Sequence, residues 1–320
     1  MKNIIILMLA VLLDLIFGDP YHIPHPITYI GKMIRLIEKG IRKTKMPLRL
    51  GGFLLMLSSV STVWVVITGL LYMANLLHPV AKDLVTIYLL YTSLAAKCLR
   101  VEIMKVYKAL KNNQLLEARK YISYLVGRDT SSLNSDEVTR AAVETVAENT
   151  VDGVLAPLLY IVIGMFFQLP VQFVFAYKTV NTLDSMVGYI QEPYKEIGFF
   201  SAKTDDVLNY IPARIGSLVM VLGGSIRGYH LKNGLKILIR DRRNHKSPNC
   251  AYPEAAVAGL LGVQIGGTNQ YFNETVEKPT IGDELIPLGF IHILDTVKIM
   301  YAAEAIMICA SILTLSILLK

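Results

Sequence analysis

The sequence predicts an all-α integral membrane protein, a multi-span helical bundle with re-entrant or broken helices and cytoplasmic helical loops. Three observations predict this fold class. Hydrophobic residues make up 53% of the 320 residues, charged residues only 18%, and the mean hydropathy is +0.46, whereas soluble domains are about a quarter charged. Long apolar runs alternate with charged stretches, and no stretch shows the sustained alternation typical of a β-strand. We expect one membrane-embedded domain over 1–320.

Four apolar runs are the clearest expected membrane spans. A helix needs about 20 apolar residues to cross the hydrocarbon core. Run 51–77 meets this without a charged residue, and run 298–319 nearly does. Run 4–17 is shorter and carries Asp14, and run 84–99 is short but flanked by charged residues that can snorkel to the interface. We expect all four to be spans.

Two further runs, 154–177 and 207–226, are uncertain spans. They contain residues that are unfavourable at the centre of a lipid-facing helix, namely Pro157, Pro170, Pro212 and Arg214. Each run is either a full crossing or a re-entrant pair of half-helices that is buried in protein.

The basic residues indicate the orientation. The formal net charge is +7, and Lys and Arg gather in 18–50, 97–140 and 226–246, between the apolar runs. Cytoplasmic loops of membrane proteins carry such an excess, so we expect these three segments on the cytoplasmic side. The same distribution argues against nucleic-acid binding as the reason for the basic charge.

A capped helix with stacked acids is the first candidate site. Asn134, followed by Glu137, is typical of a helix start, and we expect the helix to continue to about Asp152. Glu144 and Glu148 share a face of this helix, with Asp152 one turn further. The stacked acids repel one another unless a cation such as Mg²⁺ binds them. A solvated acidic face is the alternative.

Two polar stretches follow further along the chain. In the first, helical spacing places Lys178, Asn181 and Ser185 on one side, with Asp184 adjoining, a combination suited to a phosphate and its metal. An ordinary polar helix end is the alternative. The second stretch joins aspartates to basic residues, which bind either metal and phosphate or each other; they are Lys203, Asp205, Asp206 and Arg214.

Several other features are weaker. Glycines 259, 262, 266 and 267 follow His245 and two prolines, and in a membrane protein such glycines more often serve helix packing than ligand binding. His22 and His25 lie near a turn, where histidines are usually structural. The three cysteines are far apart, which argues against zinc and disulfides. The sequence contains neither a P-loop nor a Rossmann fingerprint.

Taken in order, these stretches resemble the adenosylcobinamide-phosphate synthase family of cobalamin biosynthesis. The matching pieces are Leu13-Asp14, Gly18-Asp19-Pro20, His25-Pro26, Val126–Thr130, Glu144–Leu158, Lys178–Tyr189, Phe200–Arg214, His245–Gly267 and Lys278–Gly282. Each piece is unspecific alone, but the ordered set covers most of the chain.

The resemblance implies an ATP- and Mg²⁺-dependent amide ligase. Such an enzyme joins adenosylcobyric acid to (R)-1-aminopropan-2-ol phosphate, or a related amino-alcohol phosphate, through an acyl phosphate. Within that scheme the expected Mg²⁺ ligands are Glu144, Glu148, Asp184 and, in reserve, Asp152. The expected ATP- or phosphate-binding residues are Arg128, Lys178, Asn181, Lys203 and Arg214. Asp205 or His245 is the expected general base.

The resemblance also implies a location in the cell membrane. ATP and the corrinoid are cytoplasmic, so we expect a multi-pass protein whose active site faces the cytoplasm and whose segments 154–177 and 207–226 are broken or re-entrant. Membrane lipid and other cobalamin-assembly enzymes are the expected partners. A secondary transporter of a corrinoid or other small anion and a non-catalytic membrane sensor are the alternatives.

Overall fold

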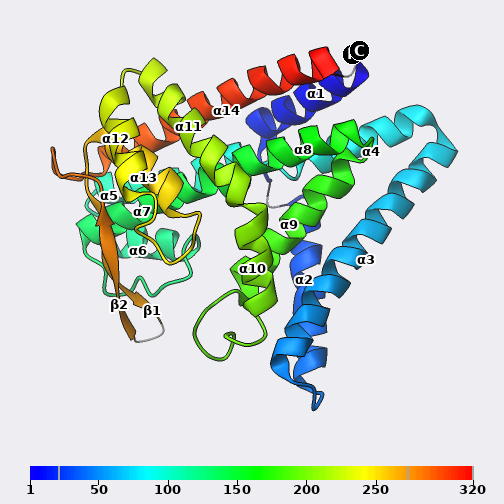
Figure 1. Cartoon of the computed structure of the whole chain (residues 1–320), viewed down its shortest axis with the longest axis horizontal. Helices are drawn as coiled ribbons and strands as arrows, with labels where there is room; N and C mark the ends of the chain where they lie inside the picture. The colour runs from blue at the N-terminus through cyan, green and yellow to red at the C-terminus, as the bar shows by residue number, and fades with distance from the viewer. Residues whose placement is uncertain (21, 272–273, 319–320) are drawn as a thin grey trace. The chain divides into compact units, whose positions relative to one another are not determined.

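The computed structural model describes residues 1–20, 22–271 and 274–318. In these residues the regular structure is helical except for one two-stranded hairpin (Figure 1). The chain folds into two compact units. The first unit comprises 1–95, 157–209 and the chain from Ser311, and the second comprises 96–156 and 210–310.

The first unit is built around one long helix. This helix, α3 (Leu48–Leu77), contacts four other helices of the unit and lies beside α2 in Figure 1. The other helices are α1 (Lys2–Phe17), α2 (Pro26–Arg42), α4 (Pro79–Tyr91), α8 (Ala156–Phe166), α9 (Pro170–Val187) and α10 (Phe199–Leu208).

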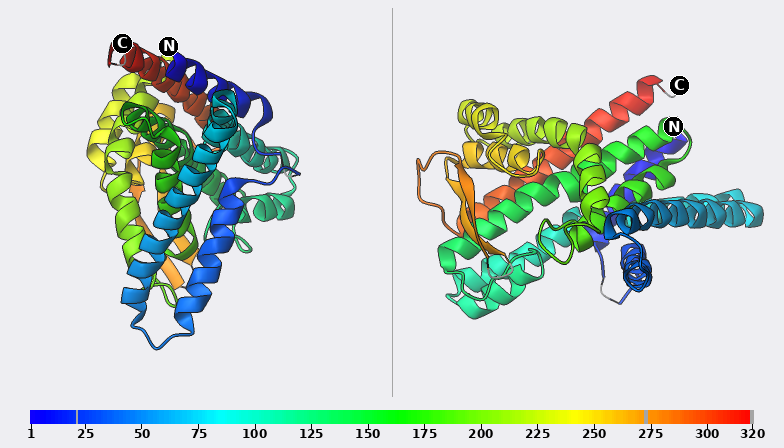
Figure 2. Two further views of the ribbon diagram at one scale, coloured as in Figure 1. Left: turned by 90° about the vertical axis from the view of Figure 1, so that its right-hand side faces the viewer. Right: turned by 60° about the horizontal axis from the view of Figure 1, so that its bottom comes forward.

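The second unit combines short helices with the hairpin, which is orange in Figure 2. Its elements are α5 (Ala96–Lys111), α6 (Leu115–Ser123), α7 (Ser135–Thr150), the π-helical turn η1 (Val151–Leu155), α11 (Tyr210–Ile226), α12 (Leu231–Asp241), α13 (Ala251–Leu261), β1 (Ile265–Tyr271), β2 (Glu274–Ile281) and most of α14 (Ile291–Leu318).

Helices α12 and α13 pack closely at two glycines. A Cβ atom on Gly259 would lie 2.7 Å from the carbonyl oxygen of Asn233 and 2.9 Å from the Cα atom of Gly234. Only hydrogen atoms at these positions allow the two backbones to approach so far. The packing role predicted for the glycine-rich segment is therefore confirmed at Gly259.

The described residues contain four helical stretches long and apolar enough to cross a membrane: Leu48–Leu77, Pro79–Lys111, Ser135–Phe166 and Ile291–Leu318. Helices α10 and α11 add a fifth if they form one span, with a bend of 47° between them. The predicted fold class, a helical membrane protein with a broken helix, is confirmed.

The helix bounds differ from the expected spans in three places. The run 84–99 is divided between α4 and α5 at Thr92–Ala95, and the run 154–177 between α8 and α9 at Phe167–Leu169. Helix α14 covers the last run but begins at Ile291, while Leu319 lies outside the described residues. Helix α1 has only 16 residues and is not among the four stretches. The single-domain organisation and the number of full crossings stay predictions.

The hairpin was not predicted, and the expectation of no strands was wrong here. Strands β1 and β2 pair antiparallel, with Ile265 opposite Ile281 and an irregularity between Gly266 and Thr268. Glycines in β1 and Pro279 in β2 are unfavourable in strands. Because these residues interrupt the alternation of polar and apolar side chains, the pattern gives no strand signal.

Candidate functional site: a carboxylate cavity in the second unit

The helix that carries the predicted acids begins as the sequence indicates. Asn134 caps α7 by accepting a hydrogen bond from the Glu137 N–H (2.9 Å), and the Glu137 carboxylate accepts one from the Asn134 N–H (2.8 Å). This reciprocal capping box fixes the start of the helix. Glu144 and Glu148 then lie four residues apart on neighbouring turns of α7.

Glu144 is held by two donors of the protein. The Arg128 guanidinium forms an ion pair with its Oε2 atom at 3.0 Å, and the Gly266 N–H donates to its Oε1 atom at 2.9 Å. Arg128 and Glu144 are only 9% and 8% exposed. Gly266 has a φ of +83°, which side chains rarely allow. Glu144 therefore links α7 both to the loop between α6 and α7, which contains Arg128, and to the hairpin.

Glu148 accepts a hydrogen bond from a thiol. The distance between Cys250 Sγ and Glu148 Oε1 is 2.9 Å. Burial raises the pKa of the Cys250 thiol well above its ordinary value, and the negative charges of Glu148 and Glu254 raise it further. Cys250 is therefore a protonated donor to Glu148 and not a nucleophilic thiolate.

Arg128, Glu144 and Glu148 border a small cavity of about 130 Å³. It is lined by residues of α7, by Glu254 of α13 and by the segment before α7, namely Leu125, Val126, Gly127, Arg128, Glu144, Thr145, Glu148, Asn149 and Glu254. Three carboxylates against one guanidinium give the lining a formal charge of −2. Such a lining attracts a cation.

Asp152 does not line this cavity. Helix α7 ends at Thr150 and Asp152 lies in the π-helical turn η1. The α-helical spacing that would place Asp152 one turn above Glu148 therefore does not continue to Asp152. π-Helical turns of this kind are often found at functional sites.

The four predicted Mg²⁺ ligands do not form a preassembled cluster in the described part of the chain. No group of three His, Cys, Asp or Glu residues there is placed to hold a metal ion. Both oxygens of Glu144 already have protein donors, and Asp184 belongs to the first unit. The donor types of Glu148, Glu254 and Asn149 nevertheless fit Mg²⁺, which takes one or two carboxylates and keeps several waters.

A second polar cluster lies in the first unit, around Asp205 of α10. Its carboxylate accepts hydrogen bonds from the side-chain amides of Asn209 (2.9 Å) and Asn181 of α9 (3.5 Å). Tyr177 donates to the Asn209 side chain at 2.9 Å and stacks on Tyr160 with the ring centroids 4.7 Å apart. Two residues predicted from separate stretches, Asn181 and Asp205, are thus brought together.

The other residues predicted in this unit are placed differently. The Lys203 ammonium lies 3.1 Å from the Asp206 carboxylate in an exposed pair three residues apart, which contributes little to stability. Lys178 and Asp184 are partly buried on α9. Their roles in phosphate and metal binding stay predictions.

Arg214 and His245 both make local contacts in the second unit. Arg214 donates to the Asn249 side chain at 3.2 Å and lies 4.4 Å from the ring centroid of Tyr252. The Ser247 N–H donates to His245 Nδ1 at 3.0 Å. In this arrangement neutral His245 carries its proton on Nε2. Arg214 thus joins α11 to the segment before α13, and its role toward phosphate stays a prediction.

His25 has the structural role expected for it. Its Nδ1 atom accepts a hydrogen bond from the Ile27 N–H at 3.3 Å and caps α2, while Nε2 lies 3.3 Å from the Asp19 carboxylate. These contacts join Asp19 to the start of α2.

Sequence reasoning missed Glu254 and Asn149, which line the cavity, and Cys250, which donates to the lining residue Glu148. A signal was present for Glu254, because it is the only acid in the small, apolar α13 and is 5% exposed. An ionisable side chain in such a run usually has a function. No local pattern could have shown that Cys250 meets Glu148, 102 residues away in sequence.

The comparisons with known proteins agree along the chain. Residues 7–300 match the family model described as CobD/Cbib protein. The chain is 48% identical over 313 residues to the cobalamin biosynthesis protein CobD of Geobacter metallireducens, covering 98% of this chain and 97% of that one. It is 46% identical to CobD of Clostridium tetani, with 98% of each chain covered, and 42% identical to the cobalamin biosynthesis protein CbiB of Salmonella typhimurium, with 93% of each covered. No solved structure matches the chain. The chain therefore belongs to the CobD/CbiB family of cobalamin biosynthesis proteins.

Proposed function

We propose that this chain is an adenosylcobinamide-phosphate synthase, an ATP-dependent amide ligase. It condenses adenosylcobyric acid with (R)-1-aminopropan-2-ol phosphate, or a related amino-alcohol phosphate, to give adenosylcobinamide phosphate. The observation that carries the proposal is the 130 Å³ cavity lined by Glu144, Glu148, Glu254 and Arg128. Family membership supplies the pathway, and the cavity supplies the anionic, cation-attracting site that phosphoryl transfer requires.

The reaction proceeds in two steps. A carboxylate oxygen of the corrinoid attacks the γ-phosphorus of ATP, which forms an acyl phosphate and releases ADP. The amine of the amino-alcohol phosphate then attacks the acyl carbon, an amide bond forms, inorganic phosphate leaves, and a base takes the proton lost from nitrogen. Both steps develop negative charge on oxygen, so both need cationic stabilisation.

The acids of the cavity have different roles in this proposal. Glu148, Glu254 and Asn149 would hold Mg²⁺, which would supply positive charge to stabilise the transferred phosphoryl group. Glu144, already paired with Arg128, is a positioning residue that holds Arg128 and the Gly266 backbone at the cavity. Asp152 and Asp184 remain candidates as further metal ligands, and Lys178 and Lys203 as phosphate ligands.

The contacts of the two candidate bases differ. His245 Nδ1 is occupied as an acceptor by the Ser247 N–H, so neutral His245 can accept a proton there only by losing this bond. Asp205 is held in position by two side-chain amides. Asp205 and His245 therefore both stay candidates for the base. Of the variants Asp205→Asn and His245→Gln, the one that removes the base should lose the acidic limb of the pH profile, where the rate falls as the base takes up a proton, and the other should retain it.

The proposed active site faces the cytoplasm, where ATP and the corrinoid are found. The basic segments 18–50, 97–140 and 226–246 support this orientation. A membrane location also suits direct transfer of the corrinoid between this chain and other cobalamin-assembly enzymes, which are its proposed partners.

The test uses the purified, detergent-solubilised full chain. Adenosylcobyric acid, aminopropanol phosphate, ATP and Mg²⁺ are added, and the corrinoid is followed by mass spectrometry. We expect a mass gain equal to condensation, dependent on ATP and Mg²⁺. Glu148→Gln should lower the rate about a hundredfold or more. The matched control is Glu117→Gln, which removes the same charge from an exposed position on α6 and should leave the rate unchanged.

Absence of product with active substrates would contradict the proposal. The bent pair α10 and α11 would then favour the second candidate, a secondary transporter of a corrinoid or other small anion, because broken helices are common in transporters. Corrinoid flux into vesicles that contain the protein would distinguish the two functions.

A further inference from the structure

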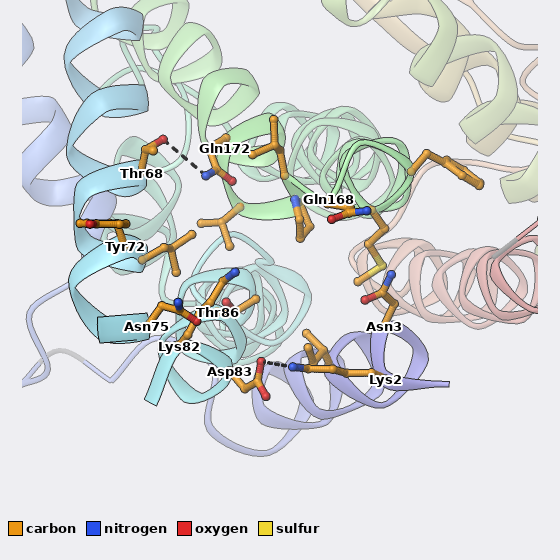
Figure 3. Close-up of a pocket in the computed structure, with 17 residues that line it drawn as sticks. Lys2, Asn3, Thr68, Tyr72, Asn75, Lys82, Asp83, Thr86, Gln168 and Gln172 are labelled. Atoms are coloured by element: carbon orange, nitrogen blue, oxygen red, sulfur yellow. Dashed lines mark hydrogen bonds and ion pairs between the residues drawn. The ribbon is translucent and has the colours of Figure 1, made fainter. Parts of the chain in front are cut away.

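A larger cavity lies in the first unit and shares no lining residue with the carboxylate cavity. Its volume is about 540 Å³, within the usual range for a small-molecule site. The lining residues come from α1, α3, α4, the end of α8, the turn after it and the start of α9 (Figure 3). The proposed ligase chemistry does not use this cavity.

The cavity lies at the ends of candidate membrane spans. Tyr72 and Asn75 belong to the last two turns of α3, and Lys82 and Asp83 to the first two turns of α4. Residues at span ends lie near the lipid headgroups, where tyrosine and lysine are common. The cavity also has apolar lining, such as Leu71, so its ligand has access to both polar and apolar surface.

The cavity has a positive character. Lys2 is paired with Asp83 at 2.7 Å, and Lys82 points into the space between the helices (Figure 3). Two lysines against one aspartate give the lining a formal charge of +1. The first turns of α1, α4 and α9 also line the cavity, and helix N-termini carry partial positive charge.

A buried amide oxygen in the cavity needs a hydrogen-bond donor. Gln172 is 5% exposed and its Nε2 atom donates to the Thr68 hydroxyl at 3.4 Å. Its Oε1 atom is buried and has no hydrogen-bond partner among the described residues. A buried acceptor that has no hydrogen-bond donor lowers the stability of the folded protein. A ligand that carries a donor would supply the missing hydrogen bond.

We propose that this cavity binds the headgroup of a phospholipid. The phosphate lies at Lys82 and the helix N-termini, and an ammonium or hydroxyl group of the headgroup donates to Gln172 Oε1. Phosphatidylethanolamine and phosphatidylglycerol meet both requirements. Phosphatidylcholine meets only the first, because its quaternary ammonium has no N–H. A soluble amino-alcohol phosphate has the same polar groups but no acyl chains for the apolar surface.

Native mass spectrometry of the detergent-solubilised full chain tests the proposal. Phosphatidylethanolamine, phosphatidylglycerol, phosphatidylcholine and free phosphoethanolamine are titrated separately. We expect the first two lipids to bind the wild-type protein at least tenfold more tightly than phosphatidylcholine, and free phosphoethanolamine to bind more weakly than any lipid. Lys82→Gln and Gln172→Leu should each weaken binding of the two preferred lipids about tenfold, a change of about 1.4 kcal/mol.

Lys45→Gln is the matched control, because it removes the same charge in the turn before α3 and should leave lipid binding unchanged. Equal binding of the three lipids to the wild-type protein would overturn the proposal without reference to any variant. Free phosphoethanolamine that binds as tightly as its lipid would overturn the assignment to a lipid headgroup.

Discussion

Glu144 and Glu148 lie one helical turn apart but have different partners. Glu144 is paired with the buried Arg128 and the Gly266 N–H, whereas Glu148 accepts from the Cys250 thiol. The first carboxylate is therefore fixed by charged and backbone donors, whereas among the described residues the second has only a weak thiol donor, which a ligand can replace. This difference makes Glu148 the stronger candidate for substrate or metal binding.

Removal of Arg128 should destabilise the protein. Arg128→Met leaves the Glu144 carboxylate buried without its cation, which typically costs about 3–5 kcal/mol. A lower thermal unfolding temperature in detergent, together with loss of stability in denaturant titration, would show this.

The double variant Arg128→Met with Glu144→Gln is the control for this prediction. It removes both charges and should recover most of the lost stability, because the cost arises from the unpaired carboxylate. If the double variant is as unstable as Arg128→Met alone, the ion pair is not the cause.

The Cys250 thiol should react slowly with alkylating reagents near neutral pH. Its pKa is raised by burial and by Glu148 and Glu254, so the reactive thiolate is scarce. In a background with Cys98 and Cys309 replaced by serine, Glu148→Gln should lower the pKa of the thiol and speed alkylation at a given pH. The rate of iodoacetamide reaction between pH 7 and pH 10 measures this, and an unchanged profile would contradict it.

At the scale of elements, the end of α12 is joined to the end of β2. Asp241 accepts two hydrogen bonds from Arg240 (2.7 and 2.8 Å) and one from the Gly282 N–H (2.8 Å). Arg240 also pairs with Asp283 at 2.7 Å. The closing Lys278–Gly282 motif of the sequence thus has a structural role, because it supplies the backbone donor that Asp241 accepts.

This junction should weaken in acid. Burial alone raises the pKa of Asp241, but the Arg240 side chain and the Gly282 N–H outweigh it, and the pKa is lowered overall. A lowered carboxyl pKa adds stability above the ordinary value near 4, which is lost as the pH falls through the lowered value. Thermal unfolding between pH 7 and pH 3 should show this loss of stability. The Asp241→Asn variant should be less stable than the wild-type protein at pH 7 and should lose less stability on acidification.

The contact between α12 and α13 should not tolerate a side chain at Gly259. Gly259→Ala places a Cβ atom 2.7 Å from the Asn233 carbonyl oxygen, and overpacking of this kind costs about 1–3 kcal/mol. Gly69 is the matched control on α3, where a Cβ atom meets nothing within 4 Å. Gly69→Ala should be neutral or slightly stabilising, and equal unfolding temperatures for both variants would count against close packing.

At the scale of the whole molecule, the interrupted helices bear on membrane topology. Helices α8 and α9 meet at Phe167–Leu169, and α10 and α11 meet at a 47° bend. If both pairs are re-entrant, the segment between α9 and α10 is cytoplasmic, as the proposed function requires.

Cysteine labelling in intact cells tests this topology. In a chain without native cysteines, Glu192→Cys should be labelled like Lys45→Cys, from the cytoplasmic side only. Both positions are exposed; Lys45 lies in the basic segment 18–50, and Glu192 lies between the two interrupted helix pairs. Leu77→Cys, at the far end of α3 and 81% exposed, should be labelled from outside. Labelling of Glu192→Cys from outside only would contradict a cytoplasmic active site.

The sequence by itself determined the helical membrane class, the capped start of α7, the shared face of Glu144 and Glu148, and the family. These features depend on apolar runs, local capping and helical spacing, all of which act over a few residues. The ordered set of motifs identified the family because it extends along nearly the whole chain.

Only the tertiary structure decided which polar side chains meet. Glu148 and Cys250, Arg128 and Glu144, and Asn181 and Asp205 are between 16 and 102 residues apart. Packing of separate elements brings each pair together, so no periodicity along the chain records it. The hairpin and the π-helical turn were likewise hidden, because backbone geometry imposed by neighbouring elements overrides the local pattern of residues.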